Sequence, residues 1–220
     1  MDAASEKITP ASAAPLPLVA EPAEIEVESI RLLELRHRLK NLLGIVQAVA
    51  NQTLRSGCSI DEARQALDGR LGAMGEAVDM LLQTGWTAAP LAELIDRALV
   101  HAGSRVRADG PDLLLSADAV MALTLVFHEL ESNSIKYGAL SAEGGSVAVN
   151  WSVVRDGRDQ LELTWSERGG PPCAPPSRQG FGSRMIDKLV GGRFRGTATT
   201  DYRPEGLRWS LSAPLLLLSP

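Results

Sequence analysis

The sequence predicts an α+β protein in which a helical hairpin precedes an α/β sandwich domain. Apolar residues recur at alternating steps of three and four over residues 32–53 and again over 67–81, which indicates two amphipathic helices. The break between them contains the turn residue Gly57, so the helices can fold back on each other. After residue 86 the pattern changes to short alternating strands around one long apolar helix.

Composition limits the functions that this chain of 220 residues can have. Apolar residues make up 45% and charged residues 22%, which is typical of globular proteins. The net charge of -5 argues against nucleic acid as the main partner, because a phosphate backbone favours a basic surface. No transmembrane segment of about 18 continuous apolar residues and no secretory signal is found. Cys58 and Cys173 form neither a zinc motif nor a disulfide framework, so we expect a cytoplasmic protein.

We expect four segments along the chain. Residues 1–26 are rich in Ala, Pro and Glu and form a disordered tail or a linker. Residues 27–86 form the helical hairpin. Each of its apolar seams is wider than one partner helix covers, which predicts a homodimer with a four-helix bundle. Residues 87–214 form the α/β domain, and residues 215–220 form a short tail.

Local signals define the elements of the α/β domain. Pro90 begins a short helix over 91–101, since proline is favourable at a first helical position. A long helix over 118–137 ends at Gly138, which we expect to act as its C-cap. The other expected elements are strands at 105–108 and 113–115 around a turn at 109–111, strands at 146–155 and 160–167 joined by the turn Asp156-Gly157, a Gly/Pro loop at 168–180, a helix at 182–190, and strands at 194–200 and 207–213.

One face of the long helix carries polar side chains suited to chemistry. Glu129, Asn133 and Lys136 lie at positions i, i+4 and i+7 and therefore share a stripe. An Asn carbonyl suits Mg²⁺, a carboxylate can accept a proton, and a lysine can bind phosphate. The same spacing also fits a solvated helix face with a Glu–Lys pair. The stripe alone leaves both interpretations open.

Two further motifs favour a nucleotide site. Gly180-Phe-Gly182 directly precedes a helix, where glycines allow the backbone to approach a phosphate and the helix N-terminus attracts it. Glu167 ends a strand whose alternating apolar residues face the core, and we expect its carboxylate to emerge there and to accept from an exocyclic amine. Gly169 would leave room for a flat ring. A solvated charge at the end of a hairpin is the alternative for Glu167.

These motifs, in this order, resemble the Bergerat ATP-binding fold of sensor histidine kinases, and within them the HWE subgroup. The resemblance covers most of residues 34–214. It is carried by His128 in His-Glu-Leu-Glu-Ser-Asn, by Trp165-Ser-Glu167, and by Glu34-Leu-Arg-His37-Arg-Leu-Lys40-Asn41, which is similar to the subgroup's phosphoacceptor box.

The resemblance implies a role for each matching residue, with ATP and Mg²⁺ as cofactors. His37 would be the phosphoacceptor; the heptad pattern places it at an exposed f position, where an imidazole can attack a γ-phosphate and then meet a second protein. Outside this context it would be an ordinary surface histidine. Glu34 or Arg38 would orient or activate His37, Glu129 would be the acid of the asparagine box, and Asn133 would bind Mg²⁺. Nucleotide contacts are implied for Asn133, Lys136, Tyr137, Glu167, Gly169, Gly180 and Gly182.

Three residues stand apart from this assignment. Glu131 and Ser132 occupy positions where the family more often has small residues. Glu131 adds a negative charge near the phosphate-binding helix, although it lies about 200° around the helix from Glu129, where solvent could surround it. His128 could form a local hydrogen bond or pack as a structural residue.

The leading function is that of an autokinase. It would move the γ-phosphoryl group of ATP to His37 and then to an Asp of a response-regulator receiver domain, with input from a separate sensory protein. Two alternatives remain. The chain could be an ATP-independent histidine phosphotransferase or adaptor with a degenerate ATP-binding domain, or a Bergerat-fold ATPase that forms no phosphohistidine.

Overall fold

The computed structural model describes residues 22–54, 59–175, 190–192 and 194–220. Gly57, Cys58, Gly180, Gly182 and nearly all of the helix expected over 182–190 lie outside the described residues. The chain divides into two compact units, Met1–Ile45 and Val46–Pro220. The second unit joins part of the helical hairpin to the α/β region, and the domain boundary expected near residue 86 stays a prediction.

The two expected N-terminal helices are present as α1 (Pro22–Leu54) and α2 (Ile60–Gln83). Ser59 and Glu62 begin α2 with a capping box: the Ser59 hydroxyl accepts from the Glu62 amide, and the Glu62 carboxylate accepts from the Ser59 amide. No helix within the described ranges combines the length and the apolar character that a membrane span requires.

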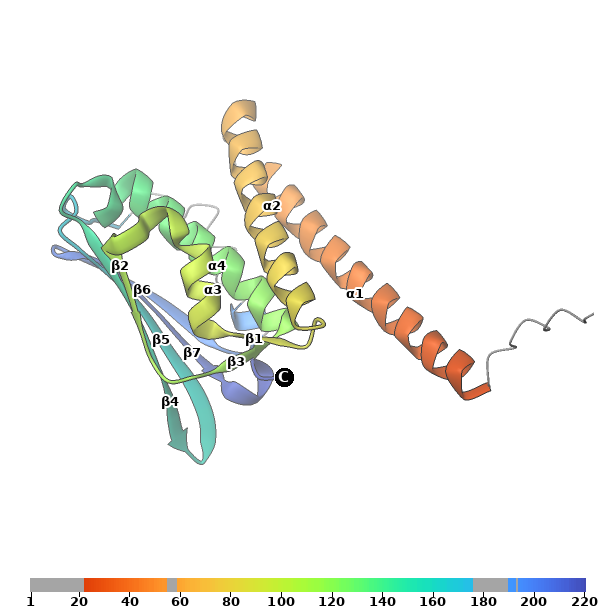
Figure 1. Cartoon of the computed structure of the whole chain (residues 1–220). Helices are drawn as coiled ribbons and strands as arrows, with labels where there is room; N and C mark the ends of the chain where they lie inside the picture. Colours follow the sequence, from red (N-terminus) through yellow and green to blue (C-terminus); the bar gives the residue numbers. More distant parts are fainter. Residues whose placement is uncertain (1–21, 55–58, 176–189, 193) are drawn as a thin grey trace, which may run out of the picture. The chain divides into compact units, whose positions relative to one another are not determined.

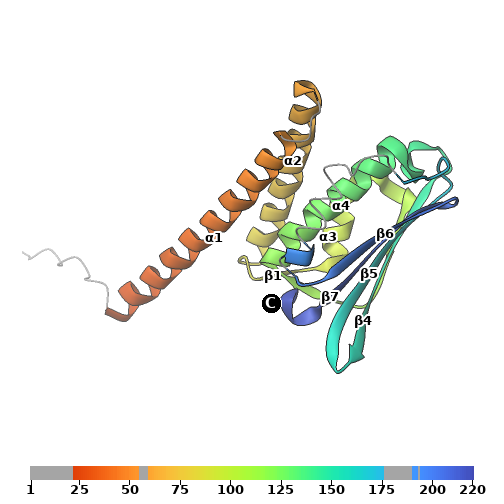
Figure 2. The same cartoon turned by 180° about the vertical axis from the view of Figure 1, so that it is seen from behind.

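The α/β region contains a five-stranded sheet in the order β2-β4-β5-β7-β6. β2 is parallel to β4, and the other neighbours are antiparallel. The strands are β2 (Val106–Asp109), β4 (Ser146–Asp156), β5 (Arg158–Arg168), β6 (Thr197–Arg203) and β7 (Gly206–Pro214). The helices α3 (Leu91–Ala98) and α4 (Ala117–Tyr137) lie against the same face of this sheet (Figures 1 and 2). The predicted α+β class is therefore confirmed.

The core forms between α4 and the sheet. Val120, Leu123 and Phe127 of α4 are fully buried. Trp165 of β5 and Trp209 of β7 are register partners on neighbouring strands, and both rings are buried. Buried aromatic and aliphatic side chains of this size contribute about 1.5–3 kcal/mol each to folding. This core sets the position of the end of α4 relative to the ends of the strands.

Three expected elements differ in the structure. The helix over 91–101 stops at Ala98, and a 3-10 segment, η1 (Val100–Arg105), follows it with Gly103 in the left-handed region at φ 55°. The strands around the turn at 109–111 do not pair with each other: β2 joins the main sheet, whereas β3 (Leu114–Ser116) pairs with an unexpected strand, β1 (Ala88–Pro90). The strand expected from residue 194 begins at Thr197.

The hairpin and the chain end follow local expectations more closely. β4 and β5 pair along their whole length around Gly157, whose φ of 71° suits a tight hairpin turn. The segment 215–220 contains a 3-10 turn, η3 (Leu215–Leu217), and Leu218 is buried. The Ser116 amide donates to the Leu218 carbonyl at 2.7 Å, which fixes this segment beside the start of α4.

Candidate functional site

The stripe on α4 separates into two environments. Asn133, Lys136 and Tyr137 are exposed on the last turns of the helix, with Tyr137 76% exposed. Glu129, two turns earlier than Lys136, is only 5% exposed. Asn133, Lys136 and the neighbouring Tyr137 are thus available to a ligand at the C-terminal end of α4, whereas Glu129 is covered by protein.

Glu129 is covered by α2 and forms a buried ion pair. The guanidinium Nε of Arg70 donates to Glu129 Oε1 at 2.6 Å, and the two side chains are 6% and 7% exposed. Arg70 Nη1 also donates to Thr53 Oγ1 at 3.0 Å, and the Thr53 hydroxyl donates to the Val49 carbonyl at 2.7 Å. The contacts form one chain of hydrogen bonds from the end of α1 through α2 to α4, all within the second unit.

Glu167 is buried rather than emerging at the strand end as expected. It continues the alternation of the core-facing residues of β5 and is 4% exposed. Its Oε2 accepts from the Ala139 amide at 2.7 Å, and its Oε1 accepts from the Trp165 indole N–H at 3.0 Å. An ionised carboxylate has about four acceptor positions, so two remain for a further donor.

Gly138 is the C-cap of α4, as expected, and its amide donates to the Asn133 and Ser134 carbonyls. α4 does end at Tyr137, but Gly138 has a φ of -108°, which other residues adopt easily. A Cβ at this position would lie 2.1 Å from Glu167 Oε2. Glycine is therefore needed because the carboxylate approaches the backbone closely, which keeps Glu167 against the end of α4.

The two glycines after β5 allow close packing of backbone against backbone. Gly169 has a φ of 75°, and a Cβ there would lie 2.9 Å from the Gly144 carbonyl oxygen. A Cβ on Gly170 would lie 2.5 Å from Ala139 Cα, in the 3-10 turn η2 (Ala139–Ser141) that follows α4. Backbone thus fills the position that a side chain would take at both glycines, and the predicted room for a flat ring beside Gly169 stays a prediction.

The donor set at this end of the domain suits a magnesium nucleotide. Asn133 offers a neutral oxygen of the kind that Mg²⁺ binds, and Lys136 offers an exposed cation for phosphate. Glu167 retains acceptor positions for an amine. The Ala139–Glu167 hydrogen bond joins the strand that carries Glu167 to the turn directly after α4.

His37 lies on α1 in the first unit and is exposed, as the heptad pattern predicted. The side-chain amide nitrogen of Asn41 lies 3.5 Å from His37 Nδ1, one helical turn later. Glu34 is placed on the same helix, three residues before His37. Their roles stay predictions.

His128 is half-buried between α4 and α2. A Cβ at Gly69 of α2 would lie 3.1 Å from His128 Nε2, so the glycine makes space for the ring. Burial lowers the pKa of His128 below its ordinary value, and the Arg70 and Lys136 charges add to this effect against the opposing charge of Glu129. The imidazole is therefore neutral at pH 7 and packs between the helices.

Comparison with known proteins connects this geometry to a family. Residues 34–112 match the family model described as HWE histidine kinase. A blue-light-activated histidine kinase of Brucella anthropi is 37% identical over 187 residues, covering 83% of this chain and 38% of the relative. A protein of the same name from Brucella ovis is 35% identical with the same coverage. The chain thus spans 38% of the length of these relatives.

Residues 34–112 thus match the HWE histidine kinase family. The resemblance expected from the sequence is confirmed. The histidine kinase domain of the Erythrobacter litoralis EL346 blue-light activated histidine kinase superposes with a TM-score of 0.56 at 18% identity, covering 89% of this chain and 95% of that one. At this identity the likeness shows the fold, which is that of a histidine kinase domain.

Sequence reasoning missed Arg70 in this HWE histidine kinase region. The residue lies on the apolar face of α2, between Leu67 and Met74 at steps of three and four. A charged residue inside an apolar seam is uncommon unless it is paired, because a buried charge without a partner is costly. The position of Arg70 in this seam could have predicted a buried ion pair. It could not have identified the partner, which lies 59 residues away in the sequence.

Proposed function

We propose that the chain is an ATP-dependent histidine kinase that autophosphorylates His37 and passes the phosphoryl group to an Asp of a response-regulator receiver domain. The main support is the Ala139–Glu167 hydrogen bond, which keeps a buried carboxylate beside the helix end that carries Asn133, Lys136 and Tyr137. Membership of residues 34–112 in the HWE histidine kinase family is consistent with this use.

Each nucleotide-binding residue has a task in this proposal. Asn133 binds Mg²⁺ through its carbonyl oxygen, and Lys136 and Tyr137 contact phosphate or ribose. Glu167 accepts a hydrogen bond from the adenine amine. Gly169 supports the strand end, and Gly180 and Gly182, outside the described residues, allow close approach of the phosphates. A magnesium ion held by Asn133 would supply charge neutralisation at the phosphates, and the chain's own residues supply positioning.

His37 is the nucleophile. Its Nε2 attacks the γ-phosphorus with its lone pair, a nitrogen–phosphorus bond forms, and ADP leaves with the electrons of the broken phosphorus–oxygen bond. The neutral imidazole is the nucleophilic form, because its ring nitrogen then carries a free lone pair. Asn41 and Glu34 orient the ring, and the exposed position allows a receiver domain to reach the phosphoryl group afterwards.

We also propose a homodimer that forms through α1. Leu32, Leu35 and Leu39 of its predicted seam are 61%, 54% and 52% exposed in the single chain. A regular row of large exposed apolar side chains on a helix is typical of an interface. A second copy would cover this row, and light scattering at micromolar concentration tests for it.

An ATP-independent phosphotransferase or adaptor is the second candidate, and the ion pair favours it. Glu129, the predicted acid of the catalytic box, is buried and bound by Arg70. A phosphotransferase would leave this pair intact, since it needs His37 but no acid at a nucleotide.

Incubation with ATP labelled at the γ-phosphate distinguishes these candidates. The kinase predicts label on the protein that survives alkali, is lost in acid, and is absent from His37→Ala and Asn133→Ala variants. A panel of purified receiver domains then tests onward transfer. Label accepted only from a phosphorylated receiver would support the adaptor instead, and ATP turnover unaffected by His37→Ala would indicate an ATPase.

A further inference from the structure

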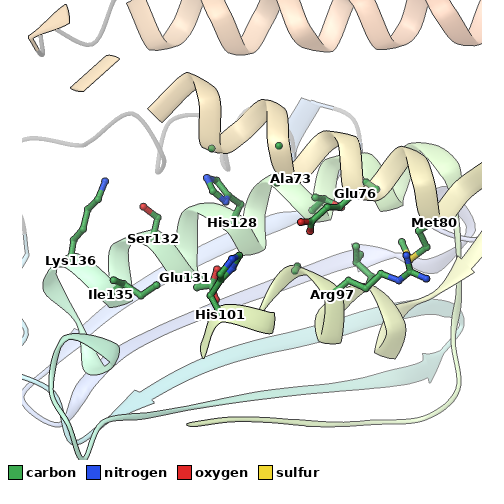
Figure 3. A pocket seen from close by; sticks show the side chains of 16 residues that line it. Ala73, Glu76, Met80, Arg97, His101, His128, Glu131, Ser132, Ile135 and Lys136 are labelled. Carbon is green, nitrogen blue, oxygen red and sulfur yellow. The ribbon is translucent and has the colours of Figure 1, made fainter. Parts of the chain in front are cut away.

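A pocket of about 350 Å³ lies between α2, α3 and α4 (Figure 3). Its α4 residues include Glu131 and Ile135, on a different flank of the helix from Asn133. Apolar side chains from all three helices line much of it, among them Ala77, Met80, Leu94 and Ile135. Ligand pockets with such linings bind an apolar body and use a few polar groups to orient it.

Glu131 is a buried carboxylate in the lining of this pocket. It is 5% exposed, so the solvated position considered from the sequence is wrong: α3, η1 and α2 cover it. Its Oε1 has no hydrogen-bond partner among the described residues. Burial raises the pKa of Glu131, while the His101 charge and the Ala102 backbone N–H partly oppose this shift. A buried acceptor without a donor costs about 1–3 kcal/mol, more when it is charged.

The pocket lining contains two carboxylates, Glu131 and Glu76, and two fixed cations, Arg97 and Lys136. Glu76 faces the pocket from α2, and its charge contributes to the raised pKa of Glu131. Arg97 also lines the pocket, but its Nη2 already donates to Glu93 Oε1 at 2.6 Å and to Gln83 Oε1 at 3.1 Å. Lys136 lies exposed at the opposite end of the lining from Arg97 (Figure 3).

His128 in the lining does not supply a compensating fixed charge. The lowered pKa of His128 keeps its ring neutral at pH 7. His101 lies beside Glu131 in Figure 3. A metal ion does not fit this arrangement, because no group of three His, Cys, Asp or Glu side chains within the described ranges is placed to hold one. An acceptor-rich, partly apolar pocket instead matches an organic cation.

We propose that this pocket binds a small organic cation, an amine or amidine with an apolar body, whose N–H group donates to Glu131 Oε1. The apolar body packs against the side chains of α2, α3 and α4, and the cation pairs with a carboxylate whose Oε1 otherwise lacks a donor. Such a ligand touches α2 and α4 together and strengthens their association. This binding does not depend on the proposed kinase activity.

Benzamidine tests the proposal, with its uncharged analogue benzamide as the control ligand. Benzamidine should bind the full chain at least about tenfold more tightly than benzamide, because a charge-assisted hydrogen bond is about twice as strong as a neutral one. The ring protons of His101 and His128 should shift in NMR spectra on titration, whereas those of His37 should not. Equal affinity for both compounds, or shifts confined to His37, would overturn the proposal.

Two variants make the test specific to Glu131. Glu131→Gln should remove the preference for benzamidine, and Glu143→Gln, at an exposed carboxylate outside the pocket, should retain it. If Glu131→Gln does not fold, Ala73→Met fills the pocket from α2 and should abolish binding of both compounds. Preference for benzamidine that persists in folded Glu131→Gln, or binding unchanged in Ala73→Met, would refute this site.

Discussion

Replacing Arg70 by alanine is expected to destabilise the unit that begins at Val46 more than any surface substitution on α2. The change leaves the Glu129 carboxylate buried without the guanidinium that donates to it at 2.6 Å. Both side chains are almost fully covered, so water cannot replace the lost donor without opening the α2–α4 contact. Removing one member of such a pair costs about 3–5 kcal/mol.

The double replacement separates the cost of an unpaired charge from the value of the pair. Arg70→Met with Glu129→Met removes both charges and fills similar volume, and exchanges of this kind are often neutral or stabilising. The double variant should therefore regain most of the stability that Arg70→Ala loses. Thr53 keeps its own bond to the Val49 carbonyl in either case, so we expect a small contribution from its lost contact.

Urea unfolding followed by tryptophan fluorescence measures these differences, since Trp165 and Trp209 are buried in the same unit. Arg64→Ala is the matched control, because the Arg64–Asp68 pair lies on the same helix at 3.8 Å with side chains 79% and 68% exposed. Such an exposed pair contributes at most about 0.5 kcal/mol. The reasoning fails if Arg70→Ala costs less than about 1 kcal/mol, or if the double variant is no more stable than Arg70→Ala.

Three further predictions concern packing and pH. Gly145→Ala should cost about 3 kcal/mol in urea unfolding, because its Cβ would lie 1.7 Å from the Ala139 carbonyl oxygen, whereas Gly144→Ala, with open space around it, should cost little; equal costs would contradict the described turn. His128 should titrate in NMR spectra below 6.5, and stability should fall as pH drops below 6.5, because the unfolded chain then binds a proton that the folded chain excludes; a midpoint at or above 6.5 would refute its burial. Glu131 has a raised pKa, so its contribution to stability is present below 4.5 and is lost as pH rises through its folded-state value; the stability of Glu131→Gln relative to the parent chain should rise over that range, and a constant difference would count against this account.

Features with a local cause could be predicted from the sequence. The alternating steps of three and four predicted α1 and α2, and the Asp156-Gly157 turn predicted the β4–β5 hairpin. The end of α4 at Tyr137 was also correct. The C-cap at Gly138 was correct too, but the close approach of a carboxylate to it was not expected, because the sequence does not reveal which distant side chain approaches a backbone. Here that side chain belongs to Glu167 on β5.

The site was predicted in part for the same reason. The exposure of His37 was expected from its heptad position, and Asn133 and Lys136 share the predicted stripe and are exposed. The burial of Glu129 and Glu131 was not expected, although both lie on the same helix. Helix periodicity gives the positions of both residues around α4. Which side of α4 is buried depends on how α2 and α3 pack against it.

The sequence alone therefore determined the helices, the hairpin and the order of the motifs of an HWE histidine kinase region. Tertiary structure decided the partner of each buried charge: Arg70 reaches Glu129 across 59 residues, and Glu167 reaches the Ala139 amide across 28. Secondary structure depends on neighbours within one or two turns or one hairpin. The environment of a carboxylate depends on which distant segments exclude water from it, and only the packed chain establishes that.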